Sequence, residues 1–228
     1  MIRSLLVLAA LGLFAASPLQ AEASGGLARR AAKPAKSSHK QVSSPVGNRI
    51  AARARQLIGV SLHSVDPSVP DDCTGLVQLA YQSAGLHLME GGGRAGDNGV
   101  MVLFRKASSL GAVRYKRPRP GDIVFFRETY DRNRDGLRND GLTHVAIVER
   151  VEAGGQLTLV HRGSRGVART RMNLQQATVH RQKRSGAVVN DYLRRASGTQ
   201  RAYLTAELFA GFASPESWSH IRRARTSR

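Results

Sequence analysis

The hydrophobic pattern changes its period near Pro118, and this change constrains the fold more than any other feature of the sequence. Before Pro118, apolar residues recur at the spacing of one helical face; after it, they alternate as in half-buried strands. Helices are predicted over 50–58, 73–84 and about 97–109. Strands are predicted over 122–127, 143–151, 156–161 and 167–172. Helices followed by an antiparallel meander predict an α+β domain.

Local cap and turn residues set the limits of these elements. Asn48 and Asp97 are placed to cap the first and third helices, and Gly59 is placed to end the first. The run Ala153-Gly154-Gly155 lies between two predicted strands, which is a hairpin signal. Residues 188–212 show no clear period, and that segment stays unassigned.

The N-terminus has the three parts of a secretory signal peptide. Arg3 supplies the positive region, residues 5–16 form a short apolar region, and Ala21-Glu22-Ala23 fits a cleavage site. An uncleaved anchor is the alternative, although the apolar region is short for a membrane span. No cysteine lies near the cleavage site, so a lipoprotein anchor is not expected. The mature protein is therefore expected to be exported, to the periplasm or the extracellular space.

The chain is strongly basic, with 35 Lys and Arg against 16 Asp and Glu in 228 residues, a net charge of +19. A basic flexible linker is expected over 24–47 and a basic tail over 214–228, which leaves a signal peptide over 1–23 and a domain over 48–213. Basic flanks attract polyanions. The expected partner is peptidoglycan or another anionic cell-wall polymer, with an anionic membrane surface as an alternative. No nucleic-acid motif is found, so nucleic acid is not an expected partner, and a monomer is expected.

Cys73 is the single cysteine of the chain, which excludes an internal disulfide and Cys-rich zinc sites. It begins a predicted helix, where unpaired N–H groups and the helix dipole favour an anion. A thiol in that place is expected to be more acidic than a free cysteine, and its thiolate is a nucleophile. Thr74 and Gly75 follow it and leave room for close approach. The alternative is a buried structural cysteine.

A cysteine nucleophile needs a base, usually a histidine held by a third group. Of the seven histidines, His144 and His161 lie on predicted strands, at the start of one and the end of the next. If these strands pair through the short glycine turn, the two imidazoles lie side by side. The remaining histidines lie in linker, loop or tail surroundings: His39, His63, His87, His180 and His220.

Four segments in order resemble the NlpC-type and CHAP cysteine peptidases, papain-like enzymes of bacterial cell walls. They are D-C-T-G-L-V-Q-L-A-Y-Q-S-A-G-L from 72, R-P-G-D-I-V-F-F from 119, T-H-V-A-I-V from 143 and L-V-H-R-G-S-R-G-V from 159. The resemblance implies a papain-like fold with N-terminal helices packed on an open, barrel-like antiparallel meander. It also implies Cys73 as nucleophile, His144 as general base and His161 as the residue that orients His144. A histidine in the third position is NlpC-like, whereas CHAP domains more often have Glu or Asn there.

The sequence departs from the family pattern in the loop before the nucleophile. Many NlpC-type enzymes carry a Tyr there that helps to form the oxyanion hole, and residues 59–63 contain none. Ser61 or a backbone N–H is the alternative donor, and Asp72 and Thr74 are further candidates for contact with the oxyanion or substrate. Asp71 and Asp72 also place negative charge beside the thiol, which opposes thiolate formation.

Residues 131–140 have the spacing of a calcium loop, with oxygen-bearing side chains at positions 1, 3, 5 and 9 and glycine at position 6. Position 12 is Leu142, which excludes a regular EF-hand. The alternative is a polar hairpin loop whose three arginines oppose cation binding. No cofactor is expected for the chemistry itself. The expected calcium ligands are Asp131, Asn133, Asp135, Leu137, Asn139 and Asp140.

The sequence therefore predicts an exported cysteine hydrolase that cleaves an amide bond in peptidoglycan stem peptides or cross-bridges. An acyl-enzyme would form on Cys73. Two alternatives remain open: a wall-binding module of the same fold with weak or no activity, and a basic surface-binding protein that acts through its tails.

Overall fold

The computed structural model describes residues 44–89 and 93–218. These residues fall within one compact unit, Lys40–Arg228. The expected signal peptide, most of the expected linker and the last part of the basic tail lie outside the described residues. No helix in the described part is long and apolar enough to cross a bilayer.

The helices come first in the chain, as the hydrophobic period predicts. Their bounds are α1 Pro45–Gln56, α2 Leu62–Val65, α3 Cys73–Gln82 and α4 Gly99–Ser109. The helix α1 begins earlier than predicted, because Ser44 rather than Asn48 caps it: the Ser44 side chain accepts from Gly47 N–H, and Pro45 occupies the first turn. Likewise, Asn98 rather than Asp97 caps α4, accepting from Met101 N–H. The short helix α2 was not predicted.

The strands form a six-stranded antiparallel sheet in the order β1-β8-β2-β3-β4-β5. Their bounds are β1 Val113–Arg114, β2 Ile123–Arg127, β3 Leu142–Val151, β4 Leu157–Gly163, β5 Gly166–Met172 and β8 Phe209–Ala213. A separate two-stranded sheet joins β6 Tyr192–Arg194 to β7 Tyr203–Leu204. The strands β2 to β5 form the predicted meander, and the sheet is open because its edge strands β1 and β5 do not pair. The α+β class is confirmed.

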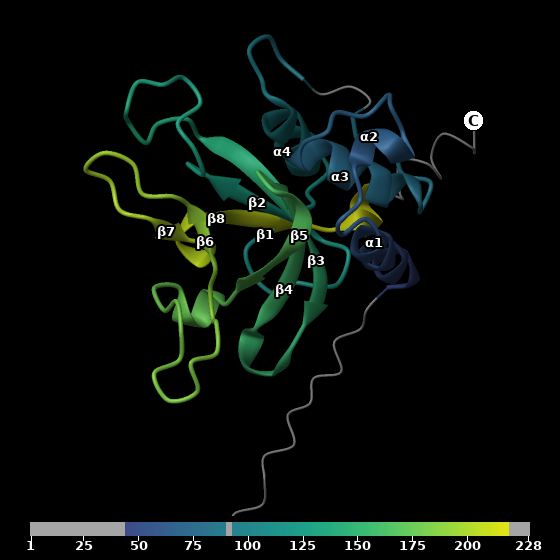
Figure 1. The fold of residues 1–228 in the computed structure, drawn as a ribbon. Helices are drawn as coiled ribbons and strands as arrows, with labels where there is room; N and C mark the ends of the chain where they lie inside the picture. Colours follow the sequence, from purple (N-terminus) through teal and green to yellow (C-terminus); the bar gives the residue numbers. More distant parts are fainter. Residues whose placement is uncertain (1–43, 90–92, 219–228) are drawn as a thin grey trace, which may run out of the picture. The chain divides into compact units, whose positions relative to one another are not determined.

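Both faces of this sheet are covered, and side chains alternate between them. Ile123, Phe125 and Ile147 point into the cluster that the helices cover, whereas Val124 and Phe126 point into a second cluster on the opposite face. In Figure 1, the helices α1 to α4 lie on one side of the sheet, and the segment that carries β6 and β7 lies on the other.

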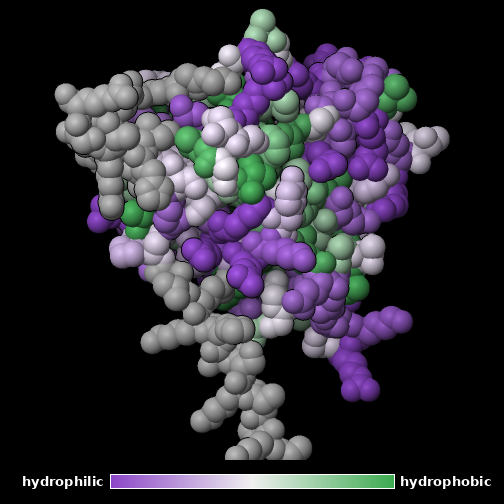
Figure 2. Space-filling view, turned by 180° about the vertical axis from the view of Figure 1, so that it is seen from behind, coloured by the Kyte–Doolittle hydropathy of each residue, from purple (hydrophilic) through white to green (hydrophobic). Residues whose placement is uncertain are grey.

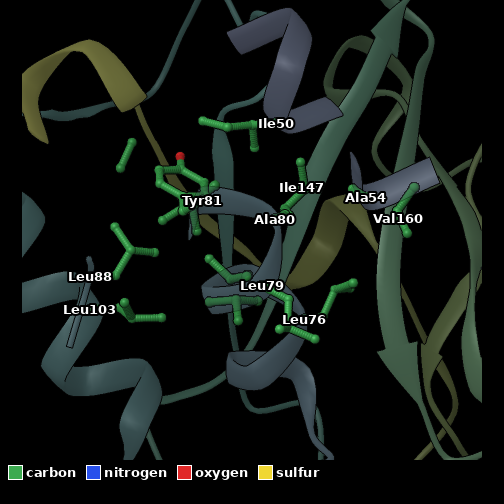
Figure 3. Close-up of a cluster of buried hydrophobic side chains, with 14 of the residues drawn as sticks. Ile50, Ala54, Leu76, Leu79, Ala80, Tyr81, Leu88, Leu103, Ile147 and Val160 are labelled. Carbon is green, nitrogen blue, oxygen red and sulfur yellow. The ribbon is translucent and has the colours of Figure 1, made fainter. Parts of the chain in front are cut away.

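The helix-side cluster is the larger of the two. Figure 3 shows side chains from α1, α3 and α4 meeting those of β3 and β4. Tyr81 lies at its centre with its hydroxyl donating to the Gly121 carbonyl, 2.9 Å away. The Trp218 ring packs edge-on against Tyr81 at 5.9 Å between centroids. The first residues of the expected tail therefore belong to the folded domain.

The second cluster depends on the segment that the sequence pattern left unassigned. The strand β8 inserts between β1 and β2 as a central strand. Leu208, directly before β8, and Phe212, within it, are fully buried. The sequence of β8, F-A-G-F-A, is short and rich in small residues, so its alternation is weak. This is why the period analysis missed it.

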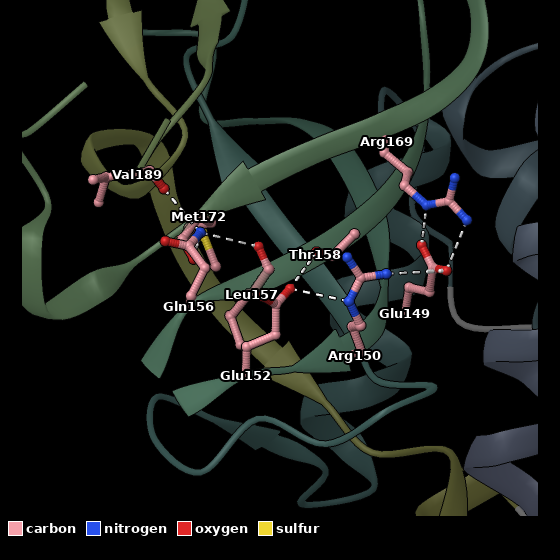
Figure 4. Close-up of polar contacts among 9 residues, drawn as sticks. All are labelled: Glu149, Arg150, Glu152, Gln156, Leu157, Thr158, Arg169, Met172 and Val189. Carbon is pink, nitrogen blue, oxygen red and sulfur yellow. Dashed lines mark hydrogen bonds and ion pairs between the residues drawn. The ribbon is translucent and has the colours of Figure 1, made fainter. Parts of the chain in front are cut away.

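Polar contacts tie the meander together and join it to the C-terminal segment (Figure 4). The Arg169 guanidinium of β5 makes two hydrogen bonds with the Glu149 carboxylate of β3, at 2.6 and 2.9 Å. The Gln156 amide donates to the Val189 carbonyl at 2.9 Å. Seen from the opposite side, the surface is mostly hydrophilic, with smaller hydrophobic areas between (Figure 2).

Candidate active site

Cys73 is the first residue of α3, as the sequence predicts, and is partly buried. Asp72 caps the helix: its Oδ1 accepts from the N–H groups of Thr74 and Gly75 at 2.8 and 3.0 Å and from the Thr74 hydroxyl at 2.6 Å. A Cβ at position 75 would overlap the Pro70 carbonyl. Gly75 therefore leaves room for the preceding loop to pack against α3, rather than for a substrate.

His144 lies on β3 and His161 on β4, and the two rings touch. His144 Nε2 and His161 Nδ1 are 3.0 Å apart, and the ring planes are nearly perpendicular. The strands pair between Ile147 and Val160 but carry no pairs beyond that point toward the histidines. The predicted hairpin thus brings the two imidazoles together, as the sequence analysis expected.

The thiol faces the start of β3 at the point where β3 and β4 diverge. The Val145 N–H, one residue after His144, acts as a hydrogen-bond donor to the thiol sulfur and lowers its pKa, as do the N–H groups of Cys73 and Thr74. Two contacts hold this arrangement in place. The Arg162 guanidinium at the end of β4 pairs with the Asp71 carboxylate just before α3 at 2.8 Å. The Asn98 amide donates to the Leu142 carbonyl at the start of β3, at 3.0 Å.

The protonation states differ from the expectation for a thiol at a helix start. Burial raises the pKa of Cys73 to about 11, with a smaller contribution from the Asp72 charge, and this outweighs the three N–H groups. Burial also lowers the pKa of His144 to about 3, with His161 adding to the effect. The pKa of His161 is lowered for the same reason, against the opposing charge of Asp191. At neutral pH the resting site therefore holds a neutral thiol and two neutral imidazoles.

Cys73, His144 and His161 line one cleft of about 1220 Å³. One wall comes from the start of α3 and from Asn98 to Val100, and another from the turn between β4 and β5. Further wall comes from Thr129 to Asp131 after β2 and from residues 191–200, a segment without a clear hydrophobic period. The cleft is thus built from both sides of the sheet.

Of the three residues expected to contact the oxyanion or substrate, two line the cleft and one does not. Asp72 and Thr74 line the cleft, but their polar groups are engaged with each other in the helix cap. Ser61 precedes α2, its carbonyl accepts from the Ser64 hydroxyl, and it is not among the cleft residues. Three N–H groups bond to the sulfur, and those of Cys73 and Val145 are not used by the Asp72 helix cap, whereas that of Thr74 is.

Sequence reasoning missed the part of the cleft built by Tyr130 and the C-terminal segment. Tyr130 is 51% exposed and follows Glu128, which adopts a left-handed backbone with φ of 57°. The buried Thr129 fixes this segment, since its N–H and hydroxyl both bond to the Thr143 hydroxyl at 2.9 Å. No sequence motif marked these residues, because their placement depends on long-range packing.

The loop 131–140 folds around its own polar groups. Asp135 accepts from Leu137 N–H and from the amides of Asn133 and Asn139, at 2.7 to 2.9 Å. Asp131 Oδ1, Asp140 Oδ2 and Gln200 Oε1 are buried oxygens without a partner. Within 44–89 and 93–218, however, no group of three or more His, Cys, Asp or Glu is placed to hold a metal ion. The expected set of six ligands stays a prediction.

Comparison with known families agrees with the fold and with the four sequence motifs. Residues 65–163 match the family model of the CHAP domain, which confirms the resemblance to NlpC- and CHAP-type proteins. The four helices and the open, mostly antiparallel sheet are compatible with the papain-like fold of that family. A CHAP domain indicates a function of the peptidoglycan hydrolase or amidase type, with peptidoglycan as the general substrate. Comparisons with curated proteins and with solved structures each found no match.

Proposed function

We propose that this protein is an exported cysteine hydrolase that cleaves an amide bond in the stem peptides or cross-bridges of peptidoglycan. The observation that carries the proposal is the histidine pair, at 3.0 Å, in one cleft with the thiol that begins α3. The CHAP match supplies the general substrate. Export rests on the N-terminal sequence, which has the parts of a signal peptide.

The contact between the histidines selects a tautomer for catalysis. If His144 Nε2–H donates to His161 Nδ1, then His144 Nδ1 is free of a proton and can accept one from Cys73. Because His161 is neutral, it can accept this hydrogen bond. Protonation of His161 at Nδ1 would reverse the bond and move the His144 proton to Nδ1, which would remove the base.

Proton transfer to His144 accompanies the attack of sulfur on the substrate carbonyl carbon. The resting thiol is neutral, so His144 acts as a general base at that step rather than as the partner of a preformed thiolate. The imidazolium then gives its proton to the leaving amine, and an acyl-enzyme remains on Cys73. Water, activated by His144, hydrolyses the thioester and restores the thiol.

The developing oxyanion needs hydrogen-bond donors that are already in place. The N–H groups of Cys73 and Val145 support this role, because both lie beside the sulfur. They come from α3 and β3, which the Asp71–Arg162 and Asn98–Leu142 contacts hold together. In this proposal backbone groups do the work of the missing Tyr side chain.

The proposal is tested by digestion of purified peptidoglycan followed by mass analysis of the soluble products. Wild-type protein is expected to release peptides or glycan fragments with a newly formed carboxylate and amine, whereas Cys73→Ala releases none. Release by Cys73→Ala at the wild-type rate would contradict the proposal. If neither protein releases product but both bind peptidoglycan, the alternative of a wall-binding module is favoured.

A further inference from the structure

The charge of the cleft is not explained by the proposed chemistry. Five arginines line it, and three of them are held by other groups. Arg162 pairs with Asp71 and Arg169 with Glu149. The buried Arg194 donates to the Glu128 carbonyl at 2.7 Å. These three arginines therefore have structural roles.

The other two, Arg165 and Arg195, are exposed at the cleft. No ion pair or hydrogen bond joins either guanidinium to another residue in the described ranges. Their backbones are nevertheless fixed. Arg165 lies in the tight turn closed by the Gly163–Gly166 pair, and Arg195 directly follows the anchored Arg194.

The carboxylates of the cleft do not pair with these two arginines. Asp72 caps α3, Asp131 accepts from Gly136 N–H at 2.8 Å, and Asp191 accepts from Arg171 N–H at 2.7 Å. Asp71 and Glu149 neutralise Arg162 and Arg169, so Arg165 and Arg195 are the exposed arginines of the cleft that no carboxylate pairs with. An exposed guanidinium without a partner can bind an anionic group of a substrate.

We propose that Arg165 and Arg195 form a carboxylate-binding subsite, so that the cleft selects stem peptides with free carboxylates over those whose carboxylates are amidated. This inference rests on the proposed function for its substrate. A guanidinium binds a carboxylate of opposite charge through two parallel hydrogen bonds. A carboxamide is uncharged and has a single acceptor oxygen, so it forms neither the charge pair nor the second hydrogen bond. Both Arg165 and Arg195 lie outside the CHAP-matched residues 65–163, so the selectivity belongs to the chain that follows the matched region.

The test measures binding rather than turnover, with Cys73→Ala protein and two soluble stem tetrapeptides. One peptide has free carboxylates and the other has the same carboxylates amidated. The free-acid peptide is expected to bind at least about 5-fold more tightly at low salt, as two solvent-exposed charge pairs allow. Added salt is expected to reduce this preference.

Arg165→Gln and Arg195→Gln together, in the Cys73→Ala background, are expected to abolish the preference for the free acid. Arg184→Gln is the matched control: it is exposed in the same C-terminal segment, removes one positive charge and does not line the cleft. It is expected to keep the preference. Equal binding of the two peptides, or a preference that survives the double substitution, would overturn the subsite.

This design separates the subsite from the proposed activity. If wild-type protein cuts peptidoglycan but binds both peptides equally, the subsite is wrong and the hydrolase proposal stands. If an arginine-dependent preference is found without any turnover, the subsite stands and the hydrolase proposal fails.

Discussion

The two faces of the central sheet are built in different ways. The helix-side face is covered by contiguous, periodic elements, α1, α3 and α4, and these include the helix that positions Cys73. The opposite face is covered by irregular chain between β5 and β8, with two short strands and two 3₁₀ turns. The helices that supply the nucleophile can therefore be predicted from the local sequence pattern. The chain that covers the opposite face and shapes the cleft is placed by long-range packing, which the local pattern does not reveal.

The same contrast appears in the match to known proteins. The CHAP match covers residues 65–163, which hold Cys73, His144 and His161. The chain beyond it supplies residues 191–200 of the cleft wall and four of the ten buried residues of the second hydrophobic cluster. We therefore expect the family core to set the chemistry and the C-terminal segment to set what enters the cleft.

The largest expected effect lies within the histidine pair. His144→Ala is expected to lower kcat by about 10²- to 10⁴-fold, because it removes the group that moves the proton. His161→Ala is expected to lower kcat less, since His161 only orients His144. His161→Asn should recover part of that loss, because the asparagine side-chain oxygen can accept the hydrogen bond from His144 Nε2–H. Steady-state kinetics on a soluble peptidoglycan fragment measure all three. Full activity of His161→Ala would place the orienting group elsewhere.

The next effect compares the two hydrophobic clusters directly. Leu103 on the helix side and Leu208 on the C-terminal side are both fully buried. Replacement of either by Ala is expected to cost about 2–5 kcal/mol of the free energy of unfolding, because each leaves a cavity. Urea unfolding measures both. If Leu208→Ala lowers the free energy of unfolding by under about 1 kcal/mol while Leu103→Ala has the full effect, the C-terminal segment contributes little to the stability of the domain.

A smaller effect is expected in the pH dependence of stability. His144 has a folded-state pKa of about 3, below its unfolded value of about 6.5, so the unfolded chain binds more protons between these values. Its contribution to stability is therefore present above pH 6.5 and is lost as the pH falls toward 3. Asp122, whose pKa is raised to about 7 by burial, acts in the opposite direction. This contribution of Asp122 is present both in wild type and in variants that retain Asp122, so it cancels when they are compared.

The difference in unfolding free energy between pH 7 and pH 4 should therefore be smaller in His144→Gln than in wild type. The exposed His87 provides the matched control, and His87→Gln should keep the wild-type difference. An unchanged difference in His144→Gln would mean that this imidazole is protonated, or solvated, in the native state.

The smallest expected effect concerns calcium. Asp131 Oδ1, Asp140 Oδ2 and Gln200 Oε1 are buried without partners, and we propose that millimolar calcium binds there and raises the Tm more than magnesium does. The double variant Asp131→Ala with Asp140→Ala should lose the rise, whereas Asp66→Ala, which lies outside the loop, should keep it. Identical melting curves with calcium and with a chelator would leave the loop as a polar hairpin.

The sequence predicted the meander, the helix that begins at Cys73 and the adjacency of the two histidines, because each depends on local period and a short turn. It did not predict β8, whose pairing with β2 joins residues far apart in the chain. It also placed the cap of α1 at Asn48 instead of Ser44, since both residue types are suitable and only tertiary packing decides. The acidity expected of Cys73 was opposed by burial, which a helix position alone does not reveal.

In the proposed reaction, Cys73 carries the acyl group while His144 serves as its base. Rapid acid quenching of the protein during turnover of a soluble peptidoglycan fragment, followed by peptide mass mapping, tests it most directly. We expect an acyl adduct on the peptide that contains Cys73, and we expect it at lower occupancy during the first turnover in His144→Ala. Continued turnover with no adduct on Cys73, or turnover by Cys73→Ala at the wild-type rate, would contradict it.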